Sequence, residues 1–167
     1  MPRCTAPSGA LALCLAASPA LALGQTEPCF TNGAPNPTIS ENWRFQAGKR
    51  DPQLMQLLAG TWRSEGPNGV GGTAVSQVTY QSDGTLTFER RTCITMQGLG
   101  TSCPASIGHG YWAAHYADGQ TVFLSTNLTI SGYDGIARPG NCSGGYFRFS
   151  DRDTTIDQQG GTSRRVR

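Results

Sequence analysis

Three side chains in the second half of the chain have the chemistry of a hydrolase. Ser143 could act as a nucleophile, His115 as the general base that activates it, and Asp134 as the carboxylate that orients the histidine. Such a set acts on esters or amides only where the three groups meet within hydrogen-bond distance. The elements that carry the three residues therefore decide whether they form a site.

The segments around His115 and Ser143, residues 113–116 and 141–145, resemble the histidine and nucleophile motifs of trypsin-like proteases. That family has two barrels and many more residues between the two motifs, and here Cys142 stands where its acidic residue precedes the serine. We expect His115 on a strand, Ser143 in a loop and Cys142 in a disulfide. The sequence therefore predicts that the protein is not an enzyme.

Metal-ligating residues are also too scattered to form a site. The two histidines, His109 and His115, would share one face of a strand about 20 Å apart. The cysteines form no C-x-x-C pair. Asp151 and Asp153 have the spacing of turn residues whose carboxylates accept hydrogen bonds from backbone amides. We therefore predict no metal and no cofactor.

Residues 1–24 have the order of a secretory signal peptide. Arg3 is followed by an apolar run at residues 10–17 and by small-residue cleavage sites at 20–22 and 22–24. No later segment is apolar over the roughly 20 residues that a membrane-spanning helix needs. We therefore expect an exported protein of bacterial type, periplasmic or secreted, with no membrane span in its mature form.

Removal of this peptide leaves Cys29, Cys93, Cys103 and Cys142. An even number of cysteines in an oxidising compartment favours disulfides over reactive thiols. Three connectivities are possible. Cys93 and Cys103 bracket a glycine-rich loop and would close on each other most easily, and Cys29 would then pair with Cys142.

Charge excludes one large class of partner. The chain has 13 basic and 11 acidic residues, spread without a run of five like charges. A nucleic-acid-binding protein normally carries a basic patch or stripe. We therefore expect no nucleic-acid partner.

Residues 25–50 form a leader without strand or helix periodicity, in which we expect an extended chain with two aromatic anchors, Trp43 and Phe45. Asp51 and Pro52 then supply the cap and first turn of one short helix. Its apolar stripe consists of Leu54, Met55, Leu57 and Leu58, and Gly60 ends it. Residues 51–167 are expected to form a single domain.

From Gly60 onward, short runs of alternating apolar and polar residues predict eight strands. Their approximate ranges are 60–65, 74–81, 85–92, 109–117, 120–126, 145–150, 154–158 and 162–167. Tight turns near residues 83, 118 and 152 alternate with longer loops at 66–73, 93–108 and 127–144. This alternation predicts an all-β fold, an eight-stranded up-and-down antiparallel barrel whose long loops share one mouth.

The helix and first strand together resemble the opening of lipocalin-like barrels. In that family a G-x-W motif, matched here by Gly60 and Trp62, follows a short helix, and the tryptophan packs at the barrel base. The resemblance implies an arginine of the last strand over this tryptophan, a cation–π contact worth on the order of 1 kcal/mol. Arg164 and Arg165 are both near the required position, and we favour Arg165.

An eight-stranded barrel encloses either packed side chains or one small ligand. Six aromatic residues are candidates to line its interior: Trp62, Tyr80, Phe88, Trp112, Phe147 and Phe149. We hypothesise that the barrel binds a small hydrophobic or amphipathic molecule. The alternative is a protein-binding module, such as a protease inhibitor or a component of an envelope complex, whose contact surface would be the leader or the loop between Cys93 and Cys103.

Overall fold

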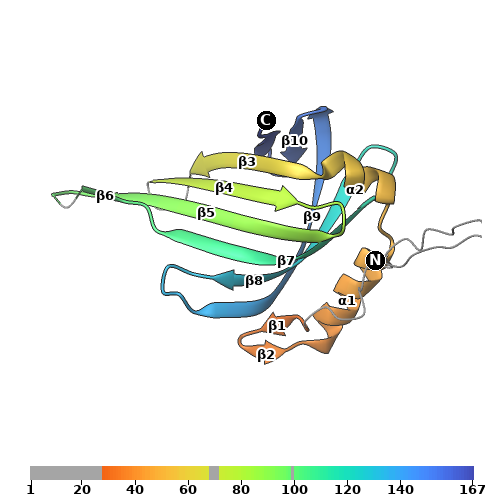
Figure 1. Ribbon diagram of the computed structural model, residues 1–167, viewed down its shortest axis with the longest axis horizontal. Coiled ribbons are helices and arrows are strands. Elements are labelled where there is room, and N and C mark those ends of the chain that lie inside the picture. The colour runs from red at the N-terminus through yellow and green to blue at the C-terminus, as the bar shows by residue number, and fades with distance from the viewer. Residues whose placement is uncertain (1–27, 68–71, 99) are drawn as a thin grey trace, which may run out of the picture.

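The structure, a computed structural model, is a closed antiparallel β-barrel of eight strands (Figure 1). It describes residues 28–67, 72–98 and 100–167, so the predicted signal peptide lies outside the described residues. The barrel strands are β3 (Gly60–Pro67), β4 (Thr73–Tyr80), β5 (Thr85–Met96), β7 (Ala105–Tyr116), β8 (Val122–Ser131), β9 (Ala137–Asp151), β10 (Thr154–Asp157) and β11 (Thr162–Arg165). The eight-stranded fold class predicted from the sequence is confirmed.

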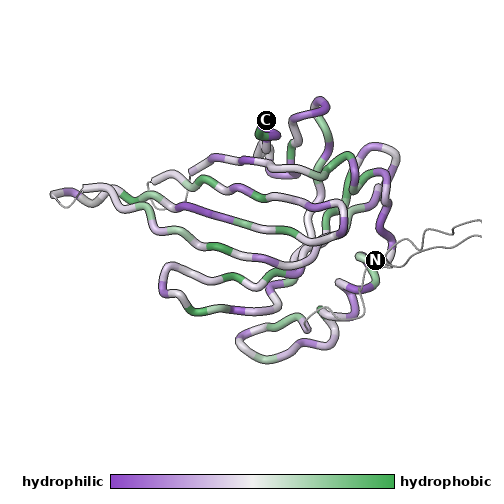
Figure 2. The backbone as a smooth tube through the Cα atoms, in the orientation of Figure 1, coloured by the Kyte–Doolittle hydropathy of each residue, from purple (hydrophilic) through white to green (hydrophobic). Residues whose placement is uncertain are grey.

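Each barrel strand pairs with its sequence neighbour, and β11 pairs with β3 to close the ring. Apolar and polar residues alternate along the strands (Figure 2), which places the apolar members in the interior. The predicted strands are all present, but several are longer than predicted. Most of 93–108 and 127–144, expected as loops, is β-ladder, because runs of threonine, serine and glycine continue the pairing without an apolar signal. A short strand, β6 (Gly100–Ser102), folds back on the end of β5.

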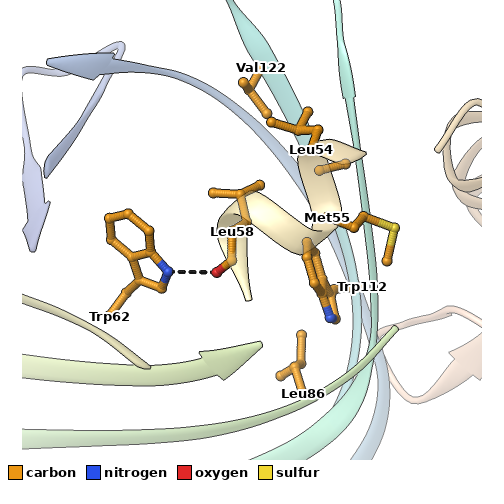
Figure 3. Packing of buried hydrophobic residues seen from close by; sticks show 8 residues of the cluster. Leu54, Met55, Leu58, Trp62, Leu86, Trp112 and Val122 are labelled. Carbon is orange, nitrogen blue, oxygen red and sulfur yellow. Dashed lines mark hydrogen bonds between the residues drawn. The ribbon is translucent and has the colours of Figure 1, made fainter. Parts of the chain in front are cut away.

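Helix α2 (Pro52–Leu58) closes one end of the barrel. The carboxylate of Asp51 accepts hydrogen bonds from the backbone N–H groups of Gln53 and Leu54, as the sequence predicts for a cap. Figure 3 shows the apolar side of α2 directed into the barrel. The side chains buried there are Leu54, Met55, Leu58, Trp62, Leu86, Trp112, Ala114 and Val122.

Arg165 joins the last strand to this helix. Its guanidinium carbon lies 4.4 Å from the centre of the Trp62 ring, so the contact expected from the lipocalin resemblance is present and Arg165 makes it. The same guanidinium donates hydrogen bonds to the carbonyls of Leu57 and Ala59, each 2.6 Å long. Gly60 has a φ of +125°, and a Cβ there would lie 2.8 Å from Arg165 Nη1, so conformation and space both require glycine.

The leader differs from its prediction. It contains a small hairpin, β1 (Phe30–Thr31) with β2 (Ala34–Pro35), and a helix, α1 (Pro37–Gly48), where an extended chain was expected. Asn36 caps α1 and Pro37 begins it, a start signal that the sequence contains but that no long apolar stripe accompanies.

Helix α1 packs on the outside of the barrel through Trp43 and Ala47, against Ala113 of β7. Trp43 is the buried anchor that was expected, but Phe45 is 63% exposed, so its assignment as an anchor is wrong. Among the described residues, no helix has the length and apolar character to span a membrane.

Two disulfides fix the outer parts of the fold. Cys29 pairs with Cys142 and Cys93 pairs with Cys103, which is the favoured connectivity. The first bond ties the leader to β9 across 113 residues of sequence, and the second ties the end of β5 to the segment that leads into β7. Two disulfides are typical of proteins from an oxidising extracellular compartment.

The position of Arg165 leads to a stability prediction. Arg165→Ala removes the stacking on Trp62 and two charge-assisted hydrogen bonds, so we expect it to lower the free energy of unfolding by about 2–4 kcal/mol. Urea denaturation followed by circular dichroism measures this. Arg164→Ala is the matched control, since Arg164 is exposed and its loss should cost about 0.5 kcal/mol or less. Equal effects of the two substitutions would contradict the assigned role.

Candidate functional site

The barrel interior contains a cavity of about 210 Å³ next to the end that α2 closes. Its apolar wall consists of Leu58, Trp62, Val78, Leu124 and Phe147. Opposite Leu124, β9 presents Gly145, where a Cβ would have no neighbour within 4 Å. The absence of a side chain at this position therefore helps to keep the cavity open.

The six aromatic residues predicted to line a pocket divide into two groups. Trp62, Tyr80 and Phe147 line the cavity. Trp112 is buried beneath it, with its ring centre 4.7 Å from that of Tyr80 and its Nε1 donating to the carbonyl of Gln81. Phe88 and Phe149 pack against the core. These last three residues belong to the packed part of the interior and not to the cavity lining.

A row of hydroxyl side chains forms the polar wall of the cavity. Thr155 of β10 pairs with Ser163 of β11, Ser163 with Ser64 of β3, and Ser64 with Ser76 of β4. Directly opposed residues in antiparallel strands lie on the same face of the sheet, and all four residues line the cavity. We call them the hydroxyl row. Within the described part of the chain, none of their side-chain oxygens has a hydrogen-bond partner.

The hydroxyl row continues onto β5 as Arg90, which pairs with Ser76. Arg91 bonds Glu89 on the outer face, 2.6 Å from Nε to Oε1, while Phe88 packs against the interior core. Because side chains alternate along a strand, Arg90 lies on the interior side. Among the described residues, its guanidinium makes no hydrogen bond or ion pair.

Arg90 lies beyond the cavity lining, and the charged residue that lines the cavity is Asp157, at the end of β10. Its Oδ1 accepts hydrogen bonds from the backbone N–H groups of Gln159 and Gly161 in the following turn. Strand β10 is four strands away from β5 around the barrel in both directions. Asp157 and Arg90 are therefore on opposite sides of the barrel.

Tyr80 adds a polar group at the inner end of the cavity. Its hydroxyl has no hydrogen bond to the described residues. Burial raises the pKa of this phenol above its usual value of about 10. Tyr80 therefore keeps its proton at neutral pH and presents an unused hydrogen-bond donor.

The three residues considered for a catalytic set are not brought together. His115 lies on β7 with its ring 5.5 Å from that of Phe123, and its Nδ1 has no partner among the described atoms. Burial, with a smaller contribution from Lys49, lowers its pKa. Ser143, expected in a loop, lies on β9 and bonds Thr126, while Asp134 pairs with Arg138 in the turn after β8.

The residues considered as metal ligands do not form a metal site, and the two aspartates considered as turn formers have different roles. Over residues 28–67, 72–98 and 100–167, no three His, Cys, Asp or Glu side chains gather as a metal site would require. Asp151 accepts a hydrogen bond from the backbone N–H of Asp153, as expected of a turn residue. Asp153 instead forms ion pairs with Arg165 and Arg167, a role that its sequence position does not indicate.

Sequence reasoning missed the polar half of the cavity. Ser64 and Ser76 each occupy an inward position two residues from an apolar or aromatic residue, Trp62 and Val78, so alternation alone could have placed them inside. Ser163 has only Gly161 and Arg165 at that spacing and gives no such signal. Aromatic residues are the sequence signal for a pocket, and isolated serines on different strands carry no such signal. Only the register of the closed barrel shows that they adjoin.

Comparison with protein-family models, with curated proteins and with solved structures found no match.

The raised pKa of Tyr80 predicts a pH dependence that one substitution removes. The folded-state pKa exceeds the unfolded value of about 10, so the associated stability is present below pH 10 and falls as pH rises through the folded-state value. Tyr80→Phe abolishes this loss. We expect the free energy of unfolding of the variant to decline less than that of the wild type between pH 9.5 and 11.

At pH 7 the two proteins should differ by about 0.5 kcal/mol or less, because the hydroxyl has no partner to lose. Urea denaturation at each pH gives both quantities. Parallel decline of the wild type and Tyr80→Phe would refute the environment assigned to this residue.

Proposed function

We propose that the protein is an exported lipocalin-like barrel that binds one small hydrophobic or amphipathic molecule in its interior. The observation that carries this proposal is the cavity of about 210 Å³ between the α2 end and the hydroxyl row. Small-molecule sites are concave and mostly apolar, with a few polar groups that orient the ligand. The apolar wall around Trp62 and the unpaired hydroxyls beside it supply both parts.

Three further features support a lipocalin-like carrier. The barrel is closed, a helix covers one end, and an arginine of the last strand stacks on the tryptophan of the G-x-W motif. Two disulfides support an oxidising location, periplasmic or extracellular. A bacterial-type exported carrier with a cleaved signal peptide fits these features.

A second candidate is a protein-binding module, favoured by exposed apolar residues at the end of the barrel away from α2. Ile107, Tyr133 and Ile136 are all more than half exposed. The leader offers a second apolar surface, because Cys29 and Trp43 hold it against the barrel while Phe45 of α1 stays exposed. A partner protein would therefore meet the strand ends or α1.

Filling the cavity should abolish ligand binding. Gly145→Leu places a large apolar side chain where no atom now lies within 4 Å of the Cβ position. We expect 1-decanol to quench or shift the fluorescence of Trp62 in the wild type and to bind the variant at least about tenfold more weakly, since binding apolar area contributes roughly 25 cal/mol per Å².

Gly119→Leu is the matched control, because Gly119 lies in an exposed turn outside the cavity and also has free space at its Cβ position. It should bind decanol as the wild type does. Circular dichroism shows that each variant is folded. Decanol binding that survives Gly145→Leu, or no binding by the wild type of any ten-carbon amphiphile, would overturn the proposal and favour the protein-binding alternative.

A further inference from the structure

The interior of the barrel is polar along one continuous line. Thr155, Ser163, Ser64, Ser76 and Arg90 are successive partners across five adjacent strands. The line ends on β7, where Ser106 pairs with Arg90. Only directly paired neighbours on this line lie close enough to share one ligand group, and the neighbours of Arg90 are Ser76 and Ser106.

An apolar line runs beside it on β3, β4 and β5, two residues nearer to α2 on each of these strands. Trp62 pairs with Val78, and Val78 pairs with Phe88. These side chains belong to the core or pack against it. The cavity therefore has an apolar inner part and a polar outer part, which fits a molecule with an apolar tail and a polar head.

The charge of the head follows from the groups that are free to bind it. Arg90 offers only N–H donors and has no partner among the described residues. The hydroxyl of Ser76, its cross-strand neighbour on β4, can donate as well. Asp157, the acidic group of the cavity, already accepts two backbone hydrogen bonds and lies on the opposite side of the barrel. The free donors therefore outweigh the free acceptors on the side of Arg90.

We propose that the ligand is an amphipathic acid whose anionic head, such as a carboxylate, binds Arg90 and its neighbour Ser76 while its apolar tail lies against Trp62 and Val78. This inference rests on the proposed function, because it assigns a head group to the ligand of the same cavity. Guanidinium–carboxylate hydrogen bonds are among the stronger polar contacts in proteins, and Arg90 is the one member of the line that carries a positive charge.

Three probes with the same ten-carbon tail test the head group. Decanoate, 1-decanol and decylamine are titrated into the full mature protein, and binding is followed by tryptophan fluorescence and by calorimetry. We expect decanoate to bind about tenfold more tightly than decanol and decylamine to bind most weakly. The preference for decanoate should weaken as salt is raised, because Arg90 is exposed.

Arg90→Gln should reduce decanoate affinity to about that of decanol and leave decanol affinity unchanged. Arg91→Gln is the matched control: it removes the same charge from the neighbouring residue, which points outward and bonds Glu89, and should change neither affinity. Arg90→Lys should retain a clear preference for decanoate. Asp157→Asn removes a negative charge from the cavity and should tighten decanoate binding while weakening decylamine binding.

The outcomes separate this inference from the proposed function. Equal binding of the three probes, or equal effects of Arg90→Gln and Arg91→Gln on decanoate, would leave the carrier proposal standing and overturn the anionic head. Tighter binding of decylamine would also overturn it. Failure of all three probes to bind would reject the carrier proposal itself.

Discussion

The fold depends on the way Arg165 and Trp62 complete the end of α2. The last carbonyls of a helix have no partner within the helix and carry a partial negative charge. Here Arg165 donates to the carbonyls of Leu57 and Ala59, and Trp62 Nε1 donates to that of Leu58 at 2.8 Å. Three successive carbonyls are thus satisfied by the first and last strands of the barrel. The same two side chains stack on each other. The contact between the first and last strands therefore also holds α2 in place.

This arrangement determines where the barrel can be open. The α2 end is filled, so space remains only toward the other end, and there the wall is uneven. Strands β10 and β11 have four residues each, whereas their neighbour β9 has 15. The cavity is lined by residues of this short hairpin, Asp157, Gly161 and Ser163, together with Gly145 and Tyr146 of β9. A short hairpin beside a long strand therefore leaves the polar wall accessible.

Sequence patterns were sufficient for the barrel because its signals are local. Alternation, aspartate–glycine turns and the cap at Asp51 each act over a few residues, and the G-x-W motif located the tryptophan that Arg165 contacts. They were insufficient for α1, whose three buried residues, Ser40, Trp43 and Ala47, are too few and too mixed to form an apolar stripe. That helix is stabilised by a disulfide and by a barrel wall that form elsewhere in the chain.

The polar wall could not be predicted for a different physical reason. Each of its hydroxyls follows ordinary strand alternation. They form a polar wall because they are paired across neighbouring strands and make no hydrogen bonds to one another. Water can solvate these groups, and an apolar molecule that displaced this water would leave them unpaired at a cost of about 1–3 kcal/mol each. A ligand with a polar head replaces those bonds. In a carrier of the kind we propose, the line from Thr155 to Arg90 would therefore select against purely apolar occupants.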